Sequence, residues 1–165
     1  MSKDNLIASL NLTREQTLHF FELDEPMLQR TYGRDKWSIR QILHHLCDSE
    51  QIFMERLKRI IAEPKQVIWA YDQDKWNDAF DYQVSPLGDK KQLYNLCRLF
   101  NMELVDKFFD THHDKPFIHS EAGLRKLGEE FERIAIHNND HIKQIETALM
   151  TTPVLLVGSI KINIQ

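Results

Sequence analysis

Three histidines of the chain have the spacing of a metal site. His137 and His141 stand four residues apart in "HNNDH", and His45 belongs to the earlier stretch "LHHLCDSE". Positions i and i+4 of a helix lie one above the other with Cβ atoms about 6 Å apart, so both imidazoles can reach one ion at roughly 2 Å. A common cation would satisfy the lone pairs of three adjacent neutral imidazoles. We therefore predict that His45, His137 and His141 bind a divalent metal.

The phase of the apolar residues separates His45 from its neighbour His44. At about 100° per residue, the apolar stripe of residues 39–61 centres roughly 90° from His45 and points almost directly away from His44. We therefore expect His44 to be a solvated surface residue. In the last helix, His141 falls inside the apolar face and His137 lies at its margin. The alternative is that each of these histidines is a core residue hydrogen-bonded to a neighbour.

Three histidine ligands without a fourth leave one coordination position for water or substrate, as in catalytic zinc sites. Nitrogen ligands also suit nickel, cobalt or iron, so the sequence does not choose the metal. Each ligating ring needs an acceptor for its second nitrogen. Asp48 and Asp140, each three residues after a candidate ligand, are candidate acceptors, although ordinary solvated acids would look the same.

Other polar residues lie in the connections between the expected helices. Tyr71, Asp72 and Asp74 belong to "AYDQDKW", where they could line the mouth of the site and relay a proton as catalytic residues. The alternative for each is packing or a solvated loop. Three further histidines occupy "THHDKPFIHSEAG", and His119 is the best candidate among them because it comes just before the last helix.

Four stretches have helical apolar periodicity, and we predict an all-α four-helix bundle in a single domain, residues 1–165. The connections between the stretches are too long for a simple up-down-up-down bundle, so the chain must cross over at least once. The tail "VLLVGSIKINIQ" is apolar and β-branched, which favours a short extended segment that docks against the body or a partner subunit. The predicted helices span residues 13–23, 38–63, 89–110 and 127–150.

The composition argues against several classes of protein. The net charge of −4 and the sequence pI of about 6.0 give no electrostatic reason to bind nucleic acid or an anionic membrane. Cys47 and Cys97 lie in apolar helical patterns, which suits buried thiols in a reducing compartment. No stretch has the apolar length of a membrane span or a secretion signal, so we expect a cytoplasmic protein.

The order and spacing of several motifs resemble the DinB-like superfamily. These motifs are "KWSIRQILHHLCDSE", "AYDQDKW", "HSEAG" and "HNNDHIKQI", and the resemblance spans roughly residues 18–150. The most similar branch contains candidate metal-dependent hydrolases related to bacillithiol transferases. The resemblance implies up-down-down-up helix connectivity, a metal (often nickel or zinc) on His45, His137 and His141, and commonly a homodimer.

Superfamily members of known activity use the metal to activate water or a thiol. The resemblance therefore implies a metal-dependent hydrolase or a transferase of a low-molecular-weight thiol, acting on a small molecule. The alternative is a noncatalytic metal-binding or stress-associated dimer. Glu50 stands where the transferase-like branch tends to have another histidine, which leaves the role of Glu50 open.

Overall fold

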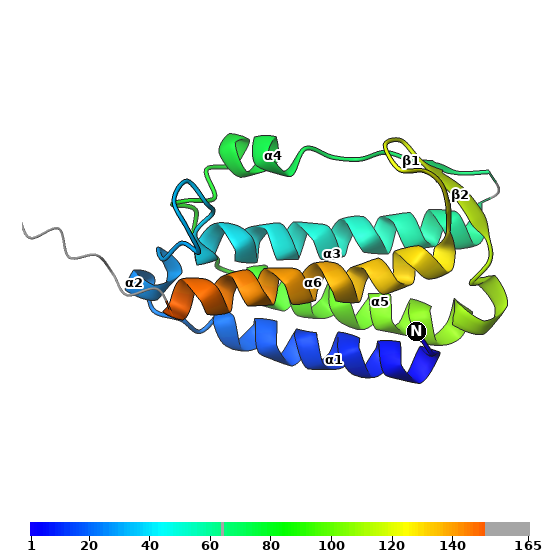
Figure 1. The fold of residues 1–165 in the computed structure, drawn as a ribbon, viewed down its shortest axis with the longest axis horizontal. Coiled ribbons are helices and arrows are strands. Elements are labelled where there is room, and N and C mark those ends of the chain that lie inside the picture. The colour runs from blue at the N-terminus through cyan, green and yellow to red at the C-terminus, as the bar shows by residue number, and fades with distance from the viewer. Residues whose placement is uncertain (64, 151–165) are drawn as a thin grey trace, which may run out of the picture.

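A computed structural model describes residues 1–63 and 65–150 of the chain (Figure 1). Four long helices form the body, and two short helices and three short strands lie in the connections. The long helices are α1 (Lys3–Phe20), α3 (Ile39–Ala62), α5 (Lys90–His112) and α6 (Leu127–Met150). The short elements are α2 (Glu25–Leu28), α4 (Gln73–Ala79), β1 (Val67–Ile68), β2 (Pro116–His119) and β3 (Gly123–Lys126). The expected extended tail, residues 151–165, lies outside the described residues.

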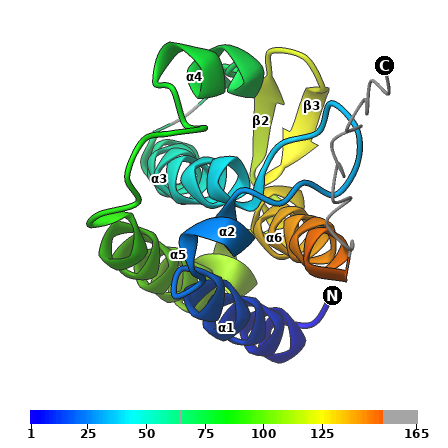
Figure 2. The ribbon, with the colours of Figure 1, turned by 90° about the vertical axis from the view of Figure 1, so that its left-hand side faces the viewer.

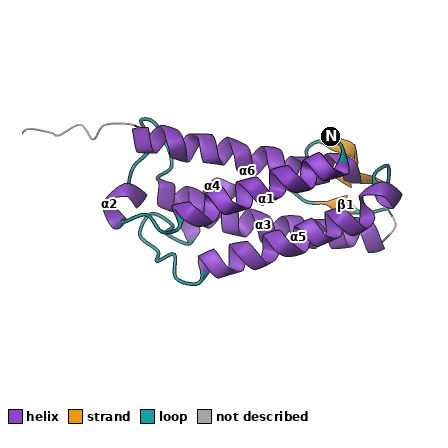
Figure 3. Cartoon of the chain, turned by 90° about the horizontal axis from the view of Figure 1, so that it is seen from below, coloured by secondary structure: helices purple, strands orange, loops and turns teal. Residues whose placement is uncertain are grey.

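The four long helices form a bundle in which α3 and α5 run in the same direction and α1 and α6 run in the opposite one (Figures 1 and 3). Helix α3 packs between α5 and α6, and α1 closes the ring by packing against the same two helices. Two consecutive parallel helices require the chain to return along the bundle between them. Residues 65–89 lie on this return path over the outer face of α3, through β1 and α4 (Figure 2). The predicted up-down-down-up bundle with long connections is confirmed.

Local sequence signals explain where α3 begins but mislead for α1. Ser38 caps α3 in a capping box with Gln41, which fits the predicted start of that helix. Helix α1 instead begins at Lys3, capped by Ser2, so the predicted start at Thr13 was wrong. The Thr13 hydroxyl donates to the carbonyl of Ser9 inside the helix. A threonine in a helix interior can bond back to the preceding turn in this way, which makes it resemble a cap in the sequence.

The connections contain a small sheet that the helical periodicity did not predict. Strand β2 pairs parallel to β1 and antiparallel to β3, with Ile118 opposite Val67 and Leu124. Gly123 opens β3 with a φ of +72°, a conformation that glycine adopts without strain. The strands are too short to give a clear alternating pattern, and their role is to fix the connections over one end of α3 and α6.

The core of the bundle has a polar layer between two apolar clusters. Phe53 and Leu57 belong to one cluster and Ile42 and Leu46 to the other. Between them, the Glu50 carboxylate accepts hydrogen bonds from Arg98 Nε at 2.9 Å and Nη2 at 2.6 Å, and from the Asn101 amide at 2.9 Å. A buried charge is tolerated when it is paired and hydrogen-bonded in this way. Glu50 therefore balances Arg98 in the core.

No helix of the described residues is both long enough and apolar enough to cross a membrane.

Candidate metal centre

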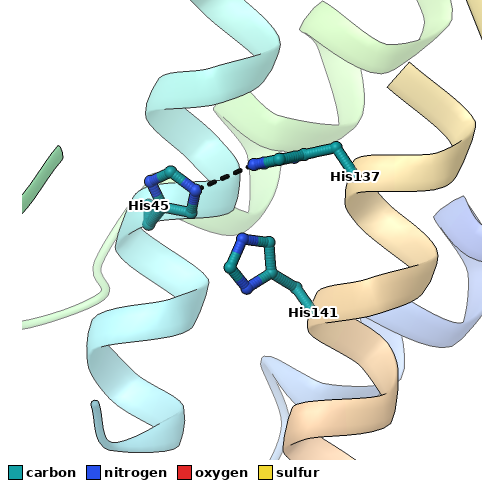
Figure 4. A group of neighbouring side chains, drawn as sticks. All are labelled: His45, His137 and His141. Atoms are coloured by element: carbon teal, nitrogen blue, oxygen red, sulfur yellow. Dashed lines mark hydrogen bonds between the residues drawn. The ribbon is translucent and has the colours of Figure 1, made fainter. Parts of the chain in front are cut away.

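The three predicted ligands converge at the level of the polar layer. Helix α3 supplies His45, and α6 supplies His137 and His141 from successive turns (Figure 4). His45 Nε2 lies 3.0 Å from His137 Nε2, and one nitrogen from each of the three rings lies within 4.8 Å of the others. The triad therefore joins two parts of the chain that are distant in sequence.

Hydrogen bonds to the second ring nitrogens orient two of the rings. His141 Nδ1 lies 2.8 Å from Gln144 Oε1, and His45 Nδ1 lies 3.3 Å from the Tyr71 hydroxyl. With the Gln144 oxygen as acceptor, His141 carries its proton on Nδ1 and directs a free Nε2 lone pair at the other two rings. Partners of this kind fix the tautomer and orientation of metal-binding histidines.

Aromatic side chains enclose the triad. The Trp37 ring lies parallel to His141 at a centroid distance of 6.4 Å and meets His45 edge-on at 5.1 Å. On the other side, Phe53 meets the ring of His137 at 5.8 Å. These apolar walls reduce the contact between the imidazoles and water, which strengthens electrostatic interactions inside the site.

Burial keeps all three imidazoles neutral. It lowers the pKa of His45 to about 3, with a smaller contribution from His141, and it also lowers the pKa values of His137 and His141. Neutral imidazole is the form that binds a metal ion. The three rings would therefore not need to release protons before binding one near neutral pH.

The donor set fits a divalent ion. Two nitrogens at about 2.0–2.1 Å from a tetrahedral zinc lie roughly 3.4 Å apart, so the separations here require only small ring rotations. The rings of His45 and His137 turn nitrogens toward each other, and a ring nitrogen of His141 faces the same space (Figure 4). Three neutral nitrogen donors suit zinc, nickel, cobalt or iron better than magnesium or calcium.

A pocket of about 300 Å³ opens beside His137. Its lining includes Ser49 and Tyr71, whose hydroxyl oxygens lie 3.0 Å apart. Ser49 Oγ also lies 3.4 Å from His45 Nε2. A second pocket of similar size reaches His141 from the side of Trp37. Small molecules therefore have space to approach the triad.

The predicted catalytic residues occupy different places around the site. Tyr71 reaches His45, as described above, and burial raises the pKa of its phenol. Asp72 lines the pocket beside His137, but its carboxylate caps α4 by accepting from the Lys75 backbone. Asp74 lines the second pocket. Catalytic roles for Tyr71, Asp72 and Asp74 stay predictions.

Neither Asp48 nor Asp140 accepts a hydrogen bond from a ring of the triad. Asp48 accepts instead from the Tyr82 hydroxyl at 2.5 Å and lies near Lys90. Asp140 is exposed and pairs with Lys143. In the structure, Tyr71 contacts His45 Nδ1 and Gln144 contacts His141 Nδ1.

The prediction that His44 is a solvated residue was wrong. Its side chain is 1% exposed, stacks on Tyr82 at a centroid distance of 4.3 Å and donates from Nε2 to the carbonyl of Ser85. Helical phase correctly placed His44 opposite the bundle core. The returning connection, however, covers that outer face of α3, so both sides of the helix are buried.

The remaining connection histidines separate into two groups. His112 and His113 end α5 and pack against Phe108 and Phe109. His119 lines the pocket beside His137, and its Nδ1 accepts backbone N–H groups of residues 121 and 122 at 3.3 Å. Of these three, only His119 reaches the candidate site.

Sequence reasoning missed Ser49 and Gln144. Ser49 follows His45 by four residues and Gln144 follows His141 by three, so helical spacing places each on the face of its histidine. The same spacing test that found the triad would have found both residues if it had been applied to neutral polar side chains.

Comparisons with known proteins agree with this architecture. The family model described as the DinB superfamily matches residues 9–145. A candidate metal-dependent hydrolase of Halalkalibacterium halodurans is 26% identical over 130 residues, 79% of this chain and 75% of that protein. Another from Oceanobacillus iheyensis is 29% identical over 124 residues, 75% of this chain and 72% of that protein.

A solved structure shows the same fold. YfiT from Bacillus subtilis, described as a probable metal-dependent hydrolase with an unusual four-helix bundle topology, superposes with a TM-score of 0.81 at 22% identity. The match covers 88% of this chain and 86% of YfiT. The family match over most of the length, together with the shared bundle, establishes that the chain belongs to the DinB superfamily.

Proposed function

We propose that the protein is a metal-dependent enzyme that acts on a small molecule, as a hydrolase or as a transferase of a low-molecular-weight thiol. The observation that carries the proposal is the convergence of His45, His137 and His141 beside an open pocket that also holds two hydroxyl groups. A divalent ion held by three imidazoles with a fourth position open supplies Lewis-acid activation of water or a thiol. The names of the relatives, candidate metal-dependent hydrolases, support the same class.

The residues around the triad provide a path for a proton. With Nε2 of His45 as the ligand atom, its Nδ1–H donates to the Tyr71 oxygen, and the Tyr71 hydroxyl donates to Ser49. The Ser49 hydroxyl proton is then directed into the pocket, beside the ligand nitrogens. The phenol of Tyr71, whose pKa is raised by burial, is protonated near neutral pH and is positioned to donate its proton to a leaving group.

The alternative is a noncatalytic site in which an ion braces the bundle. The bridging of α3 and α6 by the triad favours it, because such an ion would connect two helices. Replacement of His45 distinguishes the catalytic site from the noncatalytic one. A bracing site should lose much of its stability with its metal, whereas a catalytic site should keep its fold and lose turnover.

The experiment is a screen of the full chain, loaded with zinc or nickel, against esters, amides and pairs of thiols and electrophiles. We expect a metal-dependent rate with at least one class, abolished in His45→Ala. The absence of any such rate, with metal bound, would favour the bracing role.

We also propose that the protein is a homodimer. Leu93, Leu96, Leu99 and Phe100 form an exposed apolar face along α5, which supports a homodimer. Sedimentation of the purified chain should give twice the monomer mass of 19.6 kDa.

A further inference from the structure

One arginine differs from all the others of the described chain. The chain has nine arginines, all in the described part, and eight of them donate to or pair with a carboxylate, a carbonyl or an amide oxygen of that part. Arg133 has no such partner among the described residues. A guanidinium offers five donors in a planar fork that matches carboxylate and phosphate groups. The donors of Arg133 are therefore available to an anionic group of a ligand.

Arg133 lies in the pocket beside the triad. It precedes His137 by four residues on α6, so the two side chains occupy the same face on adjacent turns, and both line the pocket of about 300 Å³. Arg133 is also close enough to lower the pKa values of His137 and His119 by charge repulsion. The free cation is thus one helical turn from the predicted metal ligands.

His119 adds a second donor to the same pocket. Its Nδ1 accepts two backbone N–H groups, so the neutral ring carries its proton on Nε2. No partner for Nε2 occurs among the described residues. The β2–β3 hairpin therefore brings an N–H donor to the pocket that Arg133 also lines.

The other charged groups of the pocket are mostly engaged. Arg56 pairs with Glu130 and donates to the carbonyl of Trp69. Asp72 is held by Lys75. Glu121 lines the pocket with an exposed carboxylate, which would repel an anion and so weaken its binding.

We propose that Arg133 and His119 bind an anionic group, a carboxylate or a phosphate, of the small molecule on which the site acts. This inference rests on the proposed function for the identity of that molecule as substrate, but the anion site itself needs no metal. The anionic group is held by Arg133 and His119 at their part of the pocket. The reacting part of the molecule then lies toward Ser49, Tyr71 and His137, which line the same pocket. The pocket thereby selects acids or phosphate esters over neutral analogues.

The test is an NMR titration of the isotope-labelled full chain, metal-free, with inorganic phosphate and separately with acetate at neutral pH. Sodium chloride at matched ionic strength serves as the control for screening. We expect saturable shifts of the Arg133 side-chain N–H and the His119 ring signals with phosphate, with acetate or with both. Saturable shifts with phosphate alone would indicate a substrate that carries a phosphate group. Saturable shifts with acetate alone would indicate a substrate that carries a carboxylate.

Variants test the named residues. Arg133→Gln should weaken binding of the anion roughly tenfold or more, because a charge-assisted hydrogen bond is lost. Glu121→Gln should strengthen binding by removing repulsion. Arg34→Gln removes the same charge from an exposed arginine that lines none of the described pockets, and it should bind as the wild type does.

The outcomes separate this inference from the proposed function. Absence of a saturable response at Arg133 and His119, or an unchanged affinity in Arg133→Gln, would overturn the anion site even if the loaded protein is an active enzyme. Saturable anion binding in a protein that takes up no metal would leave the anion site in place and refute the proposed function.

Discussion

Replacing His45 with asparagine should remove a defined part of the acid sensitivity of the metal-free protein. His45 is 4% exposed, and burial lowers its pKa from 6.5 to about 3. In the unfolded chain, the His45 imidazole therefore binds a proton near pH 6.5, whereas in the folded chain it binds one only near pH 3. Because the unfolded state holds more protons within this window, the free energy of unfolding falls as the pH falls.

The size of the effect follows from the two pKa values. Between pH 7 and pH 5 the imidazole of His45 alone costs about 2 kcal/mol of stability, since each pKa unit corresponds to about 1.4 kcal/mol. The variant lacks this titration and should lose about 2 kcal/mol less than the wild type over the same interval.

The assay is urea unfolding of both proteins at pH 7 and pH 5, with chelator present to keep them free of metal. Ser49→Ala, which removes the neighbouring hydroxyl but keeps the imidazole, should retain most of the wild-type difference. Equal pH dependence in His45→Asn and the wild type would refute the claim that the folded protein holds His45 neutral and buried.

Further substitutions test other contacts. Tyr71→Phe should lower the turnover of the loaded protein by roughly 10²-fold or more while metal content, measured by elemental analysis, stays unchanged; full turnover would remove the phenol from the mechanism. Gln144→Ala removes the acceptor of His141 Nδ1 and should weaken metal binding by roughly 10–100-fold in a chelator competition; unchanged affinity would show that this bond does not orient the ligand. Arg98→Met leaves the Glu50 carboxylate buried and unpaired, at a cost of about 3–5 kcal/mol in urea unfolding; a loss below about 1 kcal/mol would mean that water or a neighbour replaces the guanidinium.

The bundle was largely predictable because its long helices carry strong apolar periodicity. Helix α6 begins and ends at the predicted residues, Leu127 and Met150, and α3 starts at its capping box. Helix α1 was predicted too short because Thr13 resembles a helix cap in the sequence, whereas Thr13 and Thr17 both lie inside the helix with buried hydroxyls. Those hydroxyls bond to carbonyls of the preceding turn, so they are buried without being apolar.

The candidate site was predictable where it lies on helices and not where connections complete it. Helical phase selected His45, His137 and His141, and the structure brings these three together. Phase within one helix cannot say what covers its outer face, so the burial of His44 beneath Tyr82 was missed. The hydrogen bond from Tyr71 and the approach of His119 depend on how the connections fold over α3 and α6, which no local pattern encodes.

Metal stoichiometry shows whether His45, His137 and His141 bind one ion together. The purified full chain is loaded with zinc or nickel, dialysed, and measured by elemental analysis beside His141→Ala and the matched substitution His112→Ala at the end of α5. We expect one ion per chain in the wild type and in His112→Ala, and little or none in a folded His141→Ala. Full occupancy in His141→Ala, or a folded wild type that retains no ion, would contradict metal binding by the three histidines.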